Sequence, residues 1–343
     1  MISQKTFNAS HLPRRLIIQI PCWNESEQIA SCLQTLPKTL PGFSSVETLV
    51  IDDGSADDTI KMAKAAGVDH ILALGRHKGL AQGFYEGMKY AFTTLDADIL
   101  VNFDADLQYL ATDIPKLLEP LMNGEADYVL GERQFSLISH WGQTKMALQR
   151  LGSLFVSILC KQRIHDVTTG FRALNREAGL RLSVLSNYTY TIETLVHAVH
   201  CDVSVRCVPV QTRLTPTRPS RLIRNAFLYC LRAVKTASIT LLRHRAFEFF
   251  LVLFYLATGG FIGSLALYCL SPNLPGPGHL HGRAFALCVG FGILAMDFLI
   301  AAIISDNIYT NRQMTEEMRY ELRRRDIERR STMSDAKTDL TNV

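Results

Sequence analysis

The chain has 343 residues, of which 48% are hydrophobic, and it carries eight cysteines and a formal net charge of +4. This length allows two domains, and the hydrophobic share is ample for a core and something more. So small a net charge does not by itself support a nucleic-acid-binding protein. The cysteines form no Cys-x-x-Cys pair, which argues against a zinc site and is typical of reduced thiols on a cytoplasmic face.

Strands and helices are predicted to alternate along the first 210 residues. A β-branched run from Leu16 to Ile20 precedes a helical pattern, and a second run at 46–51 precedes a helix predicted over 57–66. Ser55 or Asp57 is expected to cap that second helix. This alternation predicts an α/β domain with a mostly parallel sheet, whose ligands bind at the carboxyl ends of the strands. Further strands are predicted at 70–74, 99–103, 127–131 and 203–210.

Acidic residues follow three of these strands. Asp104, Asp106 and Gln108 present oxygens on alternate residues after the strand at 99–103. Mg²⁺ or Mn²⁺ needs only one or two protein carboxylates when a substrate diphosphate supplies further ligands. A solvated turn is the alternative for an isolated Asp-x-Asp, but three acidic groups at one edge of the sheet favour a metal site for a phosphorylated ligand. The other two groups are Glu25 after the first strand and Asp52 with Asp53 after the second.

A nicotinamide-binding Rossmann domain is rejected, because Pro21 to Asn24 stand where Gly-x-Gly-x-x-Gly is required. The recurrence of Gly79, Gly83 and Gly87 every four residues indicates close helix packing instead. His77 and Lys78 just before them either touch a diphosphate or belong to a solvated loop.

Basic groups are expected near the same edge. Arg133 ends the fifth predicted strand, where it either contacts phosphate or forms an ion pair with an acid of the site. Asp166 lies in a polar segment around a glycine turn and is a candidate base, with an ordinary loop acid as the alternative. Glu193 opens a helix predicted to run through Val199, where helix capping would be enough to explain it. Arg213, Arg218 and Arg221 form a cationic segment interrupted by two prolines.

Two apolar stretches, Phe249 to Leu270 and Ala284 to Ser305, are each long enough at about 20 residues to cross a bilayer as a helix. Their arginine-rich flanks predict that both ends face the cytoplasm, and no cleavable signal peptide is expected. The basic stretch from Leu222 to Phe250 is predicted to lie in the membrane interface, or to be an ordinary helix at the domain edge. Asp297 inside the second span is expected to face protein or water.

The predicted organisation has four parts. The tail from Arg312 is expected to form a short cytosolic helix that pairs with another subunit through Met314, Met318 and Leu322, with disorder after Ser331. The parts are a catalytic domain at 1–215, membrane-interface helices at 216–246, a transmembrane hairpin at 247–305, and a cytoplasmic tail at 306–343.

Several motifs occur in a specific order. The order of Pro21 to Glu25, Ile51 to Ser55, Asp104 to Gln108, Gly131 to Arg133 and Thr169 to Arg172 resembles that of the inverting family-2 glycosyltransferases. With the two spans, the chain is similar over residues 14–330 to polyprenyl-phosphate hexosyltransferases of the dolichol-phosphate mannose synthase kind. The resemblance implies a GT-A fold, a UDP- or GDP-linked sugar donor and Mg²⁺ or Mn²⁺. It also implies transfer of one hexose, with inversion, to a polyprenyl phosphate at the inner leaflet, and a homo-oligomer is expected.

The resemblance also implies roles for individual residues. Asp106, Asp166 and Arg133 would be catalytic, Asp104, Asp106 and Gln108 would bind the metal, and Arg133 and Lys145 would meet the acceptor phosphate. The chain departs from the family pattern at Gln149, where serine is common, and in the segment after Arg213, which leaves Arg218 and Arg221 as alternatives. The donor would be held by Pro21, Trp23, Glu25, Ile51, Asp53, Asp104, Ala105, Arg213, and Arg218 or Arg221.

Two other functions are alternatives to this one. A processive polysaccharide synthase shares the acidic motifs but carries a Gln-x-x-Arg-Trp motif and several more spans, which this sequence lacks. The second alternative is a membrane-anchored binding protein with an inactive site. The presence of both Asp104 and Asp106 together with the arginines argues against it.

Overall fold

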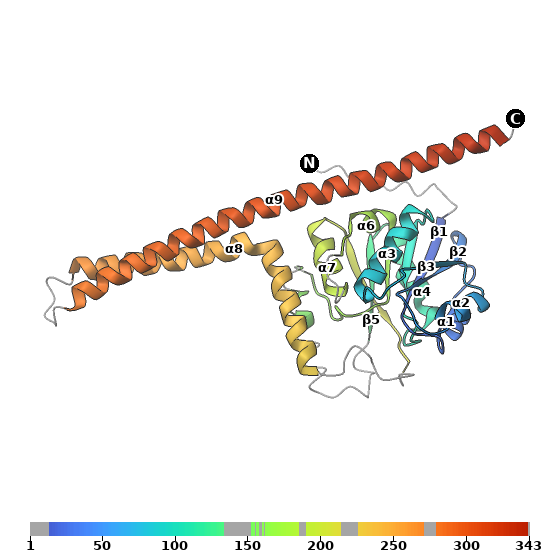
Figure 1. The fold of residues 1–343 in the computed structure, drawn as a ribbon, viewed down its shortest axis with the longest axis horizontal. Coiled ribbons are helices and arrows are strands. Elements are labelled where there is room, and N and C mark those ends of the chain that lie inside the picture. Colours follow the sequence, from blue (N-terminus) through green and yellow to red (C-terminus); the bar gives the residue numbers. More distant parts are fainter. Residues whose placement is uncertain are drawn as a thin grey trace. The chain divides into compact units, whose positions relative to one another are not determined.

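The computed structural model describes residues 14–133, 152–154, 156–157, 160, 162–184, 190–213, 226–270 and 279–341. For 226–244, 279–280 and 330–341 it describes the backbone alone. The chain divides into two compact units, one made of Met1–Val234 with Arg319–Val343 and the other of Lys235–Met318. The first unit is an α/β domain and the second is a helical hairpin (Figure 1).

Seven strands of the described residues form one sheet in the order β3-β2-β1-β4-β6-β5-β7. The antiparallel strand β6 separates β4 from β5, and every other pairing is parallel, so the carboxyl ends of the six remaining strands share one edge. The predicted mostly parallel sheet is confirmed, although β6 was missed. The strands are β1 (Arg14–Cys22), β2 (Phe43–Asp52), β3 (His70–Ala73), β4 (Ile99–Asn102), β5 (Tyr128–Arg133), β6 (Arg172–Asn175) and β7 (Val205–Val210).

Helices cover both faces of the sheet, because buried apolar side chains alternate along the strands. In β1, Leu16, Ile18 and Ile20 join a core with α1, α2 and α4, whereas Ile17 joins a core with α3, α6 and α7 (Figure 1). A sheet covered on both faces leaves its carboxyl edge as the place for a site. The helices are α1 (Ile29–Thr35), α2 (Thr59–Ala65), α3 (Leu80–Thr93), the 3-10 turn η1 (Ala111–Asp113), α4 (Ile114–Met122), α6 (Arg176–Arg181) and α7 (Thr191–His200).

The predicted cap of α2 is wrong. The N-cap is Asp58, and its side chain makes no capping hydrogen bond. Asp57 accepts a hydrogen bond from the Thr59 backbone N–H at 3.1 Å, and the Ser55 hydroxyl accepts one from the Asn24 N–H at 2.9 Å. The polar groups after β1 and β2 therefore hold those two loops together.

The predicted close packing of the α3 glycines is confirmed at Gly87. A Cβ atom there would lie 2.6 Å from Gln19 Oε1 and 2.7 Å from the Ile51 side chain. At Gly83 the nearest atom to such a Cβ is 4.0 Å away, and Gly79 precedes the helix with a positive φ of 93°. Only Gly87 is thus required by a close approach of α3 to the sheet.

Residues 319–329, here called the C-terminal arm, belong to the α/β unit. The Tyr320 hydroxyl donates to Glu177 Oε1 at 2.8 Å, and the Arg181 guanidinium lies 4.8 Å over the Tyr320 ring. Arg323 donates to the Leu180 carbonyl at 2.9 Å and to the Tyr85 hydroxyl. The arm therefore contacts α6 and α3. The side chains of Met314, Met318 and Leu322, which the sequence predicts to pair with another subunit, are exposed.

The second unit contains the apolar parts of α8 (Ala226–Leu270) and α9 (His279–Thr341). Helix α8 is interrupted at Arg245, where φ is −136°. Within the described residues, Arg245–Leu270 and a part of His281–Arg329 are long and apolar enough to cross a membrane, and 11% and 6% of their most apolar windows are buried. Such low burial separates them from the core helices of a soluble protein. The sequence predicts disorder after Ser331, but helix α9 continues to Thr341.

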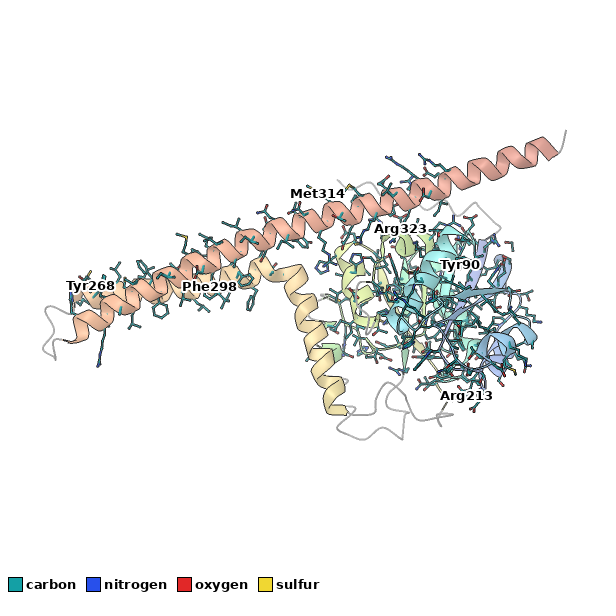
Figure 2. The ribbon with its side chains drawn as sticks, in the orientation of Figure 1. Tyr90, Arg213, Tyr268, Phe298, Met314 and Arg323 are labelled. Carbon is teal, nitrogen blue, oxygen red and sulfur yellow. The ribbon has the colours of Figure 1, made fainter. Side chains whose placement is uncertain are left out.

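The two apolar helices pack closely against each other. A Cβ atom at Gly260 would lie 2.8 Å from the Phe291 ring, and the rings of Tyr268 and His281 stack at 4.1 Å. Figure 2 shows the side chains around Tyr268 and Phe298 pointing outward along this hairpin. Asp297 is exposed on the hairpin.

Candidate active site

The acidic groups predicted to share one edge of the sheet do so. Asp53 directly follows β2, Glu25 follows β1 and Asp104 follows β4, and these three strands are mutually parallel. Arg133 is the last residue of β5, which is parallel to β4 because both pair with β6 in the opposite direction. Carboxylates and a guanidinium group are therefore brought to the carboxyl edge from four different strands.

The turn after β4 presents Asp104 and Asp106. Leu107 takes a left-handed φ of 59°, and Asp106 accepts a hydrogen bond from the Gln108 N–H at 3.0 Å. Burial raises the pKa of Asp104 well above its usual value, and the charge of Asp106 adds to this while Arg133 and Arg172 oppose it. Two neighbouring carboxylates that repel each other in a partly buried turn fit the hard-oxygen donor set of Mg²⁺ or Mn²⁺.

Asp53 has its two oxygens engaged by the loop before α3. The N–H groups of Lys78 and Gly79 donate to it at 2.7 and 2.8 Å, and His77 Nδ1 lies 2.9 Å from Oδ2. The His77 ring stacks on Trp23 with the ring centroids 4.1 Å apart, and Trp23 is 41% exposed. From the sequence, His77 either touches a diphosphate or belongs to a solvated loop. In the structure its side chain contacts the Asp53 carboxylate.

Asp166 and Arg133 form a buried ion pair. Arg133 Nε and Nη2 donate to the two Asp166 oxygens at 2.6 and 3.0 Å, and Nη2 also donates to Thr168 Oγ1 at 2.7 Å. Burial would lower the pKa of Arg133, but the charge of fully buried Asp166 and its hydrogen bonds raise it. The ion pair considered for Arg133 from the sequence is confirmed, and its partner is the residue considered as a base.

The remaining predicted site residues fall into two groups, inside and outside the described part of the chain. Pro21 and Ile51 are partners in the register of β1 and β2, and Ala105 is buried beside the acidic turn. The Arg213 N–H donates to the Gln108 carbonyl at 2.9 Å, so the exposed Arg213 labelled in Figure 2 adjoins the acidic turn as expected. Lys145, Arg218 and Arg221 lie outside the described residues.

Several polar residues behind the acidic turn were missed as parts of the site. Arg172 is fully buried and donates to the Thr169 carbonyl at 2.7 Å, the Tyr128 hydroxyl at 2.5 Å and Thr194 Oγ1 at 3.0 Å. The signal in the sequence is the Thr169 to Arg172 motif, which is one of the family motifs but assigns no role to Arg172. Only the antiparallel pairing of β6 with β4 brings this motif next to Asp104.

Comparisons with known proteins agree with this geometry. The profile of glycosyl transferase family 2 matches residues 17–180. Glycosyltransferase AglJ of Haloferax volcanii is 31% identical over 240 residues, which cover 65% of this chain and 73% of that relative. The chain belongs to glycosyltransferase family 2. The polyprenol monophosphomannose synthase of Mycolicibacterium smegmatis is another relative of this glycosyltransferase, 26% identical over 208 residues that cover 57% of the chain and 77% of the synthase.

A solved structure shares the fold of this family-2 glycosyltransferase. Glucosyl-3-phosphoglycerate synthase of Mycobacterium tuberculosis, determined with Mn²⁺, uridine diphosphate and phosphoglyceric acid, superimposes with a TM-score of 0.50 at 20% identity. The match covers 67% of this chain and 78% of that one. The GT-A fold and the family predicted from the motifs are thus confirmed.

Proposed function

We propose that this glycosyltransferase moves one hexose from a nucleotide-diphospho-sugar to a polyprenyl phosphate at the cytoplasmic leaflet, with inversion. The observation that carries the proposal is the meeting of the Asp104–Asp106 turn with Arg133 and Arg213 at one edge of the sheet. Carboxylates suit a cation and arginines suit phosphate oxygens, so this edge suits a diphosphate on one side and a second phosphate on the other. The name of the mycobacterial synthase supports a polyprenyl acceptor.

The donor is assigned to the part of the edge formed by β1, β2 and β4. Trp23 offers an exposed ring for stacking on the nucleobase, and Asp53 holds the His77–Gly79 loop beside that ring. Arg213 adds positive charge near the diphosphate. Glu25, Pro21, Ile51 and Ala105 line the same region by their places at the strand ends.

Asp104 and Asp106, with Gln108, would hold Mg²⁺ or Mn²⁺. The bound ion would neutralise negative charge on the departing nucleoside diphosphate. Burial and, after it, the repulsion between the two carboxylates raise the pKa of Asp104, and a divalent cation would relieve that repulsion.

The acceptor requires little from a base, because a phosphate monoester is already anionic at neutral pH. Asp166 and Thr168 fix the orientation of the Arg133 guanidinium, and Arg133 in turn attracts the acceptor phosphate. Asp166 therefore acts through Arg133, as a positioning residue. Lys145 is proposed as a second contact to that phosphate from its place in the family pattern.

The membrane orientation follows from the two candidate spans and the arm. Two crossings return the chain to the side from which it started, and the arm after the second span contacts α6 of the catalytic unit. The arginines flanking the spans favour the cytoplasm for that side. These features support the inner leaflet as the proposed place of the reaction.

The test is an assay of the purified full-length protein with a panel of labelled UDP- and GDP-sugars, a short polyprenyl phosphate and Mg²⁺ or Mn²⁺. One lipid-linked sugar of inverted anomeric configuration, seen by NMR, is the expected product. A polymer would favour a processive or other family-2 activity, and no product with any donor would favour the binding protein.

A further inference from the structure

The Thr169–Gly170 turn lies directly against the carboxylate of Asp104. A Cβ atom built on Gly170 would lie 2.8 Å from Asp104 Oδ1 and nearer still to Oδ2. Gly170 is absent from the described glycines with positive φ, so its backbone conformation does not require glycine. What excludes a side chain at this position is the closeness of the Asp104 oxygens.

Buried side chains hold the turn in that place from behind. Asn102 Nδ2 donates to the Gly170 carbonyl at 2.8 Å, and the Gly170 N–H donates to the Tyr109 hydroxyl at 3.2 Å. Arg172 Nε donates to the Thr169 carbonyl at 2.7 Å. Asn102 and Arg172 are fully buried and Tyr109 is 3% exposed, so these bonds are shielded from water.

These three side chains are themselves fixed. Gln19 Nε2 donates to Asn102 Oδ1 at 2.9 Å, which directs the Nδ2 group of Asn102 to Gly170. The Tyr109 hydroxyl also shares a hydrogen bond with Thr169 Oγ1 at 3.2 Å. The turn is consequently held at both peptide groups that border Asp104.

We propose that the Thr169–Gly170 turn is a positioning element that sets the place of the Asp104 carboxylate for the divalent cation, with Asn102, Tyr109 and Arg172 as its support. The inference rests on the proposed function. A methyl group at residue 170 would have to displace Asp104 by about 1 Å to reach ordinary contact. Metal and catalytic sites tolerate misplacements of only about 0.5 Å, so cation affinity should fall.

The test is Mn²⁺ binding to the full-length protein in detergent, followed by EPR of the free ion with and without UDP. Gly170→Ala is expected to weaken Mn²⁺ binding by roughly tenfold or more, as changes beside metal ligands do. Tyr109→Phe keeps the glycine but removes the hydroxyl that holds it, and a smaller loss of affinity is expected.

Gly179→Ala is the matched control. A Cβ atom there would lie 2.8 Å from Cζ of Phe92 and nearer to two other ring carbons, in the contact of α6 with α3. This variant should lower the unfolding temperature while binding Mn²⁺ like the wild type at temperatures where it is folded. Equal losses of affinity in Gly170→Ala and Gly179→Ala would overturn the inference, because destabilisation alone would then explain both.

The remaining outcomes are also decisive. Wild-type affinity in folded Gly170→Ala would overturn the inference and leave the proposed function standing. If Gly170→Ala does not fold, the Tyr109→Phe variant tests the inference instead. A Mn²⁺ affinity equal to that of the wild type in Tyr109→Phe would then overturn the inference. A wild type that binds no Mn²⁺ even with UDP would refute the metal part of the proposed function, and the inference with it.

Discussion

Charged groups behind the site are buried, and each has partners that compensate for lost water. Asp166 is matched by Arg133, and the guanidinium of Arg172 is surrounded by carbonyl and hydroxyl oxygens. Asp104 and Asp106 differ, because their like charges repel each other, which adds to the effect of burial on the pKa of Asp104. Like charges close together in a partly buried turn are costly, so the proposed cation would stabilise this pair.

Asp106→Asn is expected to reduce transfer by at least about a hundredfold, because it removes one anionic ligand and with it much of the stabilisation of the leaving group. Asp166→Asn keeps an acceptor for Arg133 and is expected to cost less. The measurement is the initial rate of lipid-linked sugar formation across a Mg²⁺ titration. Full activity in excess chelator, or a larger loss in Asp166→Asn than in Asp106→Asn, would contradict this order.

Arg172→Ala is expected to lower the free energy of unfolding by about 3–5 kcal/mol, since it leaves several buried oxygens without a donor and opens a cavity. Chemical unfolding of the detergent-solubilised protein measures the change. Arg206→Ala is the control, because its ion pair with Glu125 is exposed and should contribute under about 1 kcal/mol. Equal stabilities of the two variants would show that Arg172 is replaceable.

Glu47 predicts a pH effect on stability. Burial would raise its pKa, but hydrogen bonds from His70 and Arg15 outweigh burial and lower the pKa from 4.5 to about 2. Because the folded-state value is the lower one, the stabilisation is present above pH 4.5 and is lost as the pH falls toward 2. The thermal midpoint of Glu47→Gln should lie below that of the wild type at pH 7 and approach it near pH 2. A pH-independent difference would contradict this assignment.

At the scale of elements, the approach of α3 to the sheet gives a paired prediction. Gly87→Ala is expected to destabilise the protein by about 1–3 kcal/mol, because its Cβ has no room beside Gln19 and Ile51. Gly83→Ala, on the same helix, meets nothing closer than 4.0 Å and should be neutral or stabilising by up to about 1 kcal/mol. Unfolding curves of both variants provide the comparison, and equal effects would exclude packing as the reason.

The sequence predicted most strands, because β1, β2 and β4 are apolar runs closed by polar turns. It missed β6, whose four residues begin with an arginine and show no alternation. This strand exists because it pairs with both β4 and β5, a contact between residues some 45–75 positions apart that no local pattern encodes. Some strands are also longer than predicted. Strand β2, predicted over 46–51, begins at Phe43, which pairs with Arg14.

The same distinction applies to the site. Glu25, Asp53, Asp104 and Asp106 were predictable as one group, because parallel strands bring their carboxyl ends to one edge. The ion pair of Asp166 with Arg133 could not be predicted, because the path of the chain into β6 decides which acid reaches that arginine. The support of Gly170 by Asn102 and Tyr109 requires coordinates, because it joins residues about 60 to 70 positions apart.

For the whole molecule, the contact of the arm with α6 makes membrane orientation testable. A C-terminal tag and the catalytic unit should lie on the same side, so protease should reach both in inverted vesicles and neither in intact cells. The protein should also stay in the membrane fraction after carbonate washing. Protection of the tag in inverted vesicles would contradict the predicted double crossing.

The arm also bears on how a water-soluble enzyme could be produced. Cutting the chain at Val234 would discard Tyr320, which is 7% exposed and packs with the core beneath α3 and α6. The shortened protein would then expose the apolar surface that Tyr320 covers, and Glu177 would lose its hydrogen bond from Tyr320 while keeping its ion pair with Arg181. Excising Lys235–Met318 and rejoining the ends through a flexible tether would retain that cover, and is the better starting point for crystallisation or screening.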